Sequence, residues 1–315
     1  MSSNWVRPTH VSVAALWLVV AGLASGFLFA QTAVVTVPVG RGPEGVTVVF
    51  DGATLSVWVA NLFSNTVTKL RASDGAVLAV LPVGNRPVAV ATSIGPAGSV
   101  SIWVANSRGD TVTKLRALDG AILGTFPAGQ GPQGLAFDGS NIWVTNERSN
   151  TVTKLRASDG ATLGTFPVGK RPVGVAFDGS SIWVANQLSN TVTKLSALDG
   201  TNLGTFPVGN GPFAVAWAGG HIWVANYFSK SVTKLLPTTG AVAGTHAVGD
   251  GPAGFASDGT YLWVANNGSS NVMKLDPSTG SVLATLSVGR SPFGVAFDGA
   301  HIWVASFGTN TVSRL

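Results

Sequence analysis

The sequence predicts an all-β protein, a seven-bladed β-propeller of four-stranded blades. One tryptophan recurs in nearly identical phrases, "VWVAN" at residues 57–61 and "IWVAN" at 182–186 among them. From Trp103 onward the step between copies is always 40 residues, and each unit divides at turn residues into four short apolar pieces. A four-stranded unit of about 40 residues is typical of a propeller blade. The seven copies are Trp58, Trp103, Trp143, Trp183, Trp223, Trp263 and Trp303.

Each unit is expected to contain four strands in a fixed order. In the fourth unit these are residues 173–177, 181–186, 191–197 and 201–208, separated by "DGS", "QLSN" and "LDG". The pieces are rich in Val, Ile, Thr, Phe and Trp and are bounded by Gly, Pro, Asn and Asp, which indicates strands joined by turns. Asp-Gly suits a tight hairpin because glycine accepts a positive φ.

The two ends of the repeat array indicate that the chain closes into a ring. The last unit stops at "NTVSRL", residues 310–315, and lacks a fourth strand. An extra strand-like piece, "TAVVTVPVG" at residues 32–40, precedes the first unit. We expect this N-terminal strand to complete the last blade and remove the open edge. A β-solenoid, the alternative, usually has a shorter period and no leftover strand at each end.

Residues 1–30 differ from the repeats and predict export. Arg7 and His10 precede an uncharged apolar run at residues 11–30, and Ala30 is a candidate cleavage point. This pattern indicates a signal peptide, and the run is also long enough for an N-terminal membrane anchor. Both interpretations place the propeller, residues 31–315, outside the cytoplasm, periplasmic or secreted. A membrane would be contacted only through an uncleaved segment.

Few ionisable residues are available for chemistry. Ten of the 14 acidic residues occupy Asp-Gly or equivalent turns, which leaves Glu44, Asp110, Glu147 and Asp250. The four histidines show no metal-ligand spacing within one element, and cysteine is absent. We therefore predict no catalytic residue, no metal and no cofactor. The net charge of +5 is too small to argue for nucleic acid.

The phrase "IWVANQLSNTVTKL", residues 182–195, resembles the YVTN-type β-propeller repeat. The resemblance covers residues 32–315 and implies a seven-bladed ring, often exported or at the cell surface and mostly without a defined reaction. Related propellers include NHL-type binding modules and the virginiamycin B lyases. The lyase-type repeat tends to read Trp-Phe-Thr-Glu where this chain has Trp-Val-Ala-Asn, which weighs against a lyase activity.

Differences between the units are concentrated in two connections, from fourth to first strand and from second to third strand. We call these the variable connections, and in a four-stranded meander both emerge on one face. They hold eight basic residues, and the four remaining acids fall on or near the same face, about +4 by this count (8 − 4), whereas the ten turn aspartates lie on the opposite face. We predict ligand contacts from this face. The candidate residues are Arg41, Arg86, Arg108, Arg148, Lys170, Arg171, Phe213, Arg290 and Phe293.

The residues after the proline that opens each first strand should line the mouth of the central channel. They are Glu44, Val88, Gln133, Val173, Phe213, Ala253 and Phe293. The sequence thus favours a monomeric, non-catalytic binding or scaffold module for an anionic or partly apolar small molecule, peptide or protein. The alternative is a lyase or hydrolase with a site at the channel.

Two constant features are interpreted as structural. We expect the seven tryptophans to pack between blades. The basic residue of each third strand should lay its alkyl stem on apolar surface while its charge reaches water. These residues are Lys69, Lys114, Lys154, Lys194, Lys234, Lys274 and Arg314.

Overall fold

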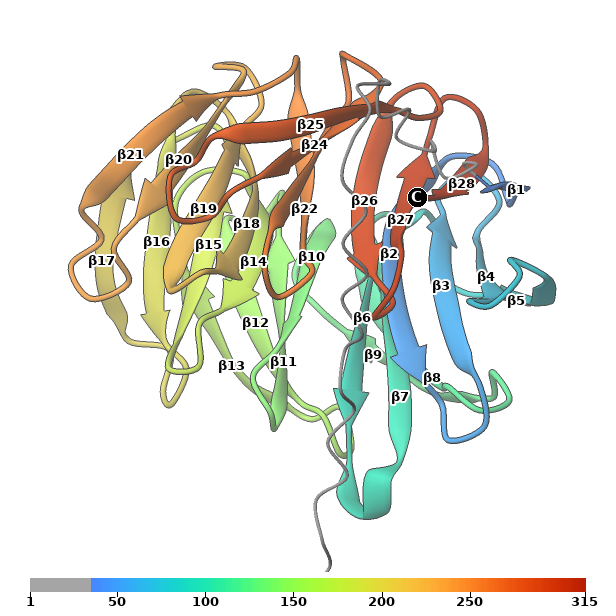
Figure 1. Ribbon diagram of the computed structural model, residues 1–315. Helices are drawn as coiled ribbons and strands as arrows, with labels where there is room; N and C mark the ends of the chain where they lie inside the picture. The colour runs from blue at the N-terminus through green and yellow to red at the C-terminus, as the bar shows by residue number, and fades with distance from the viewer. Residues whose placement is uncertain (1–34) are drawn as a thin grey trace, which may run out of the picture. The chain divides into compact units, whose positions relative to one another are not determined.

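The computed structural model describes residues 35–315, which form seven four-stranded antiparallel sheets arranged as a ring (Figure 1). The first strands of neighbouring blades contact one another around the whole ring, and β2 (Pro43–Phe50) meets β26 (Pro292–Phe297) where it closes. The predicted all-β seven-bladed propeller is confirmed. The predicted signal peptide or anchor at residues 1–30 lies outside the described residues.

The strand bounds follow the predicted units. Blade 1 has β2, β3 (Leu55–Asn61), β4 (Thr66–Arg71) and β5 (Val77–Pro82). Blade 2 has β6 (Pro87–Ile94), β7 (Val100–Asn106), β8 (Thr111–Arg116) and β9 (Ile122–Pro127), with a 3-10 turn η1 (Pro96–Gly98) between β6 and β7. Blade 3 has β10 (Pro132–Phe137), β11 (Asn141–Asn146), β12 (Thr151–Arg156) and β13 (Thr162–Pro167).

The remaining blades repeat the same order. Blade 4 has β14 (Pro172–Phe177), β15 (Ser181–Asn186), β16 (Thr191–Ser196) and β17 (Asn202–Pro207). Blade 5 has β18 (Pro212–Ala218), β19 (His221–Asn226), β20 (Ser231–Leu235) and β21 (Val242–Ala247). Blade 6 has β22 (Pro252–Ser257), β23 (Leu262–Asn266), β24 (Asn271–Leu275) and β25 (Val282–Ser287). Blade 7 has β26, β27 (Ile302–Ser306), β28 (Thr311–Arg314) and β1 (Val35–Pro38). Within residues 35–315, no helix is long and apolar enough to cross a membrane.

The N-terminal strand closes the ring as predicted. β1 pairs antiparallel with β28, with Val35 opposite Arg314 and Val37 opposite Val312. Val37 is buried in one cluster with Trp303 of blade 7 and Leu70 of blade 1. The first and last parts of the chain therefore share one sheet, and β1 contributes core packing as well as hydrogen bonds.

The repeated tryptophans are buried between blades, which confirms their packing role. Trp183 of blade 4 is fully buried against Val215, Ile222 and Val224 of blade 5. Its indole Nε1 donates a hydrogen bond to Asp178 Oδ2 at 2.7 Å. The turn aspartate thus satisfies the one polar atom of a buried ring.

Most of the basic residues of the third strands do not send their charges into water, so that expectation was wrong for them. Lys69, Lys114, Lys154 and Lys234 are 6–8% exposed. Lys154 Nζ, for example, donates to the carbonyls of Ala197 and Leu198 in the next blade at 2.7 and 2.9 Å. The third-to-fourth turn presents carbonyl oxygens that need donors, so these ammonium groups link one blade to the next.

Candidate functional site

Both variable connections lie at one end of the channel, as predicted. The backbone of one is hydrogen-bonded to the other; for example, Arg148 N–H donates to the Gln130 carbonyl at 3.0 Å. Residues of both connections line a cavity of about 390 Å³ at the mouth of the channel. A second cavity of about 240 Å³ continues between the first strands and touches all seven predicted mouth residues.

The repeat phrase "SNTV" explains how the loop residues are positioned. Asn65 Oδ1 accepts the Arg86 N–H at 2.9 Å, and Asn150 Oδ1 accepts the Arg171 N–H at 2.8 Å. Arg86 and Arg171 have φ of 53° and 55°, at a position where four other blades carry glycine. A side chain in this left-handed region costs free energy, and such strain is concentrated at functional sites.

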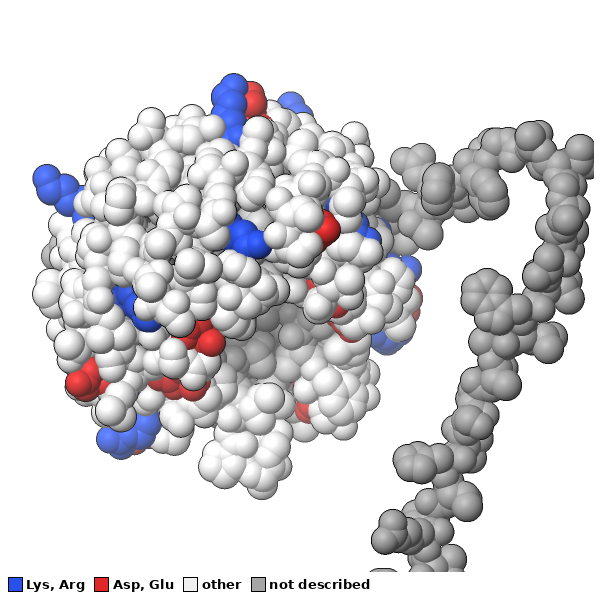
Figure 2. Space-filling model, turned by 60° about the vertical axis from the view of Figure 1, so that its left-hand side comes forward, with Lys and Arg blue, Asp and Glu red and all other residues white. Residues whose placement is uncertain are grey.

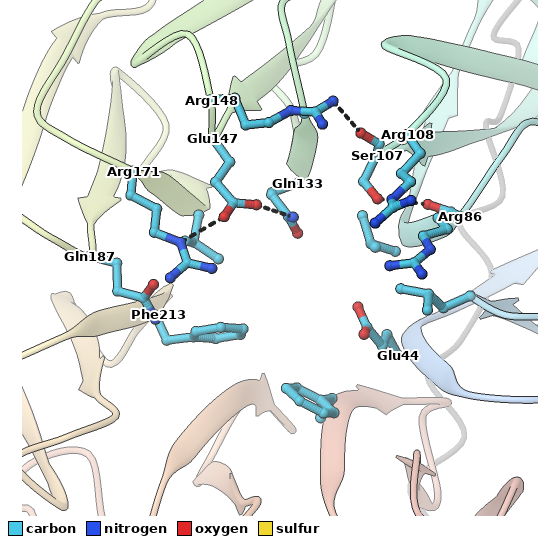
Figure 3. A pocket seen from close by; sticks show the side chains of 15 residues that line it. Glu44, Arg86, Ser107, Arg108, Gln133, Glu147, Arg148, Arg171, Gln187 and Phe213 are labelled. Atoms are coloured by element: carbon cyan, nitrogen blue, oxygen red, sulfur yellow. Dashed lines mark hydrogen bonds and ion pairs between the residues drawn. The ribbon is translucent and has the colours of Figure 1, made fainter.

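One half of the mouth, in blades 2–4, is charged, and we call it the charged arc: Arg86, Arg108, Glu147, Arg148 and Arg171. Figure 3 shows these side chains around the cavity. Arg171 Nε lies 2.6 Å from Glu147 Oε1, whose partner oxygen accepts a 2.5 Å hydrogen bond from Gln133. Arg148 pairs with Asp110 at 2.7 Å. Among the described residues, Arg86 and Arg108 have no carboxylate within 4.0 Å.

Glu44 lines both cavities and lies next to Arg86 at the mouth (Figure 3). Burial raises the pKa of this carboxyl to about 8; Glu147 adds to the rise and Arg86 opposes it. Near neutral pH the group is therefore mostly protonated. It can donate a hydrogen bond, and it does not repel an anion that approaches Arg86.

Gln187 supplies an unsatisfied polar atom beside the cavity. This residue is 6% exposed, and its Oε1 has no hydrogen-bond partner among residues 35–315. A buried carbonyl oxygen without a donor is costly, and here it lies next to a space that a ligand could fill (Figure 3). The site therefore offers an acceptor as well as cationic donors.

The other half of the mouth is a continuous row of rings, which we call the aromatic arc. Its members come from blades 5, 7 and 1. Successive ring centroids lie 5.4–6.0 Å apart, distances typical of aromatic pairs. Arg86 lies over the last ring, 5.6 Å from the Phe63 centroid, and joins the two arcs. In order the row is Phe228, Tyr227, Phe213, Phe293, Phe307 and Phe63.

The structure brings six of the nine predicted binding residues together at the larger cavity: Arg86, Arg108, Arg148, Arg171, Phe213 and Phe293. Arg41, Lys170 and Arg290 are exposed and do not line this cavity. Sequence reasoning missed Gln187 and the aromatic row beyond Phe213 and Phe293, and it placed Gln133 at the mouth without its hydrogen bond to Glu147. The available signal was that aromatic residues in the second-to-third connections occur only in blades 1, 5 and 7.

The predicted charge contrast between the two ends of the ring is smaller than expected. Of the 19 basic residues, one is Arg7 and eight lie in the variable connections. The other ten lie on third strands, near the turn aspartates. Four of them form ion pairs there: Lys69–Asp51, Arg71–Asp74, Arg116–Asp119 and Arg156–Asp159. In the view of Figure 2, cations and carboxylates lie scattered, several side by side. The opposite end is thus nearly neutral.

No group of three or more His, Asp or Glu residues among the described residues could hold a metal ion. No protein-family model and no curated protein matches this sequence. Among solved structures, Kuenenia stuttgartiensis hydrazine synthase superposes with a TM-score of 0.77 at 18% identity, covering 92% of this chain and 99% of that chain. A streptogramin B lyase structure gives 0.72 at 18% identity, covering 90% and 96%. At this identity the likeness establishes the fold alone.

Proposed function

We propose that this chain is an exported YVTN-type binding propeller whose channel mouth takes a small molecule with a carboxylate at one end and an aromatic or flat apolar body at the other. The observation that carries the proposal is that the charged arc and two rings of the aromatic arc, Phe213 and Phe293, face one cavity. The cavity volume of about 390 Å³ falls in the range of small-molecule sites.

Each part of the ligand has a partner in the site. Arg86 and Arg108 are cationic, line the cavity and have no carboxylate within 4.0 Å among the described residues. A guanidinium fork can donate two hydrogen bonds to a carboxylate. Phe213 and Phe293, 6.0 Å apart, offer ring faces to the apolar body. Gln187 Oε1 could accept a hydrogen bond from a hydroxyl or amide N–H on the ligand.

The charge of Glu147 does not oppose this proposal. Arg171 lies 2.6 Å from its carboxylate, and Gln133 donates to the second oxygen. Glu44, with its raised pKa, is mostly neutral. The site therefore keeps a net attraction for one negative group.

The experiment is a thermal-shift screen of the full chain against matched pairs of compounds, each carboxylic acid beside its neutral amide. A ligand that binds the folded state raises the melting temperature. We expect acids with a ring to stabilise the protein and their amides to do so less. Replacing Arg86 and Arg108 together by Ser should remove the preference for the acid and its salt dependence. Equal shifts for acids and amides would contradict the proposal.

A catalytic function is the second candidate, and one observation favours it. Glu44 has a pKa near neutrality beside Arg86 in the cavity, as a general acid or base requires. The test is turnover of any screening hit. Product formation that disappears in Glu44→Gln would support a lyase or hydrolase, and a hit recovered unchanged would support binding only.

A further inference from the structure

Blade 2 departs from the repeat at the end of the ring opposite to the mouth. Its first two strands, β6 and β7, are joined through the 3-10 turn Pro96–Gly98, and the hairpin projects beyond the neighbouring turns (Figure 1). The extra length replaces the turn aspartate that most other blades carry. Trp103 Nε1 donates instead to Ser93 Oγ at 2.9 Å. The hairpin therefore removes a carboxylate from this position.

Lys114 donates only to backbone carbonyls, as Lys154 of blade 3 also does although its blade has the turn aspartate Asp138. In blade 1, Lys69 Nζ donates to the carbonyls of Ala117 and Leu118 and lies 2.7 Å from Asp51 Oδ2. Lys114 Nζ donates to the equivalent carbonyls of Ala157 and Ser158, at 2.8 and 3.0 Å, and to no carboxylate.

An ammonium group carries three N–H donors, so one donor of Lys114 has no acceptor among the described residues. Lys114 is 8% exposed. Burial lowers its pKa, and Asp159 partly offsets this effect, as expected for a buried cation that lacks a carboxylate partner.

A cavity of about 630 Å³ opens beside Lys114, between the β6–β7 hairpin and blade 3. Arg156 and the serines Ser93, Ser101 and Ser140 also line it, and no acidic residue does. The nearest carboxylates have other partners. Asp138 accepts from Trp143 and from backbone N–H groups, and Asp159 pairs with Arg156 at 2.9 Å.

We propose that this cleft is a second ligand site, which binds the oxyanion group of a small hydroxylated molecule through Lys114 Nζ. The carboxylate of Asp51 beside Lys69 illustrates the geometry, because an anionic oxygen fits at 2.7 Å together with both carbonyls. Ser101, buried and facing the cavity, can donate a second hydrogen bond, and the wall formed by Ile94 and Phe137 can cover carbon atoms of the ligand.

Blade 5 provides a matched control inside the same chain. It also lacks the turn aspartate, and Lys234 Nζ donates to the carbonyls of Pro277 and Ser278, both at 2.8 Å. Its turn is short, and a side chain at Gly219 would meet Pro277. Lys234→Met thus removes the same interblade hydrogen bonds as Lys114→Met without changing the cleft.

The test is calorimetric titration of the full chain with inorganic phosphate, sulfate and acetate at constant ionic strength. We expect saturable binding of at least one of these anions. Lys114→Met should weaken anion binding about tenfold or more, because a charge-assisted hydrogen bond to the anion is lost. Lys234→Met and the mouth variant Arg86→Ser/Arg171→Ser should keep the wild-type affinity. The preferred anion distinguishes a phosphate or sulfate ester from a carboxylate.

A second variant keeps the test decisive if Lys114→Met does not fold. Ser101→Ala removes only the hydroxyl and should weaken binding several-fold, since one neutral hydrogen bond is lost. The proposal is overturned if no anion binds the wild type, if Lys114→Met and Lys234→Met weaken binding equally, or if binding disappears in Arg86→Ser/Arg171→Ser. That last result would assign the anion to the mouth.

Discussion

The charged arc and the aromatic arc use the same backbone and differ only in side chains. In both, a second-to-third connection is hydrogen-bonded to the fourth-to-first connection beside it, as in Arg148 N–H to the Gln130 carbonyl and Phe63 N–H to the Arg41 carbonyl. Blades 2–4 place guanidinium and carboxylate groups on this frame, and blades 1, 5 and 7 place rings on it. The scaffold therefore fixes where a ligand would lie, and the loop side chains determine what it would be.

Backbone strain at one equivalent position also varies from blade to blade. Gly42, Gly131 and Gly211 have φ near 65° at no steric cost, whereas Arg86 and Arg171 of the charged arc adopt φ near 54° with full side chains. Blade 7 has Ser291 there, with φ of 54°. Placing arginine where glycine fits better is expected where a side chain is needed for binding rather than for stability.

The largest effect is expected from deleting residues 31–40, which should damage the aromatic arc first. This deletion removes β1, so blade 7, which carries Phe293 and Phe307, loses its outer strand and the packing of Val37 on Trp303. We expect a lower melting temperature, reduced solubility and faster hydrogen exchange in blade 7 than in blade 3. A truncated protein with the melting temperature of the parent would show that closure by β1 is dispensable.

Replacing the buried tryptophans should affect both arcs alike. Trp183 lies beneath the charged arc and Trp303 beneath the aromatic arc, and both are fully buried. Changing either to Ala should lower the free energy of unfolding by about 3–5 kcal/mol, because a large cavity is left between blades. Chemical denaturation measures this change in the free energy of unfolding. An unchanged midpoint for Trp183→Ala would contradict its role in packing.

The next prediction concerns the pH dependence of stability at Glu44. The fold raises its pKa from the ordinary range to about 8. Folding therefore favours the protonated form, and the stability due to this group is lost as the pH rises from about 4.5 towards 8. We expect the denaturation midpoint of the wild type to fall between pH 5 and pH 8 more than that of Glu44→Gln. Parallel pH profiles for the two proteins would show that Glu44 titrates normally.

The smallest effect is expected from relieving the strain in the charged arc. Arg86→Gly should leave the unfolding free energy unchanged or raise it by up to about 1 kcal/mol, because glycine tolerates the left-handed conformation. Ser291→Gly, at the same φ but outside the arc, is the control and should behave similarly. A clear loss of stability in Arg86→Gly alone would mean that the Arg86 side chain stabilises the fold.

The sequence predicted the fold almost completely, because the fold depends on what the seven units share. Three features each predicted one structural element. The Trp103-to-Trp143 spacing predicted the blades, the extra strand at residues 32–40 predicted ring closure, and the turn aspartates predicted hairpin turns. The loop arginines and the mouth residues could also be placed, since a four-stranded meander fixes which connections share a face.

What could not be predicted depends on contacts between units. Three features depend on how neighbouring blades meet. Lys154 is buried against carbonyls of the next blade, Arg171 pairs with Glu147, and Gln187 Oε1 has no partner among the described residues. A count of charges placed these groups on a face but could not assign their partners. The continuous aromatic row likewise requires knowing that blades 7 and 1 are adjacent in the ring.

The most direct test of the proposed site is the affinity of 3-phenylpropionate and its neutral amide for three proteins: the wild type, Arg86→Ser/Arg108→Ser and Phe213→Ala/Phe293→Ala. The account predicts that the wild type binds the acid at least about tenfold more tightly than the amide, as a charge-assisted hydrogen bond implies. This preference should disappear in the arginine variant, whereas the phenylalanine variant should bind both compounds more weakly and keep the preference. An acid preference that survives in Arg86→Ser/Arg108→Ser would contradict the division of the mouth into a charged and an aromatic arc.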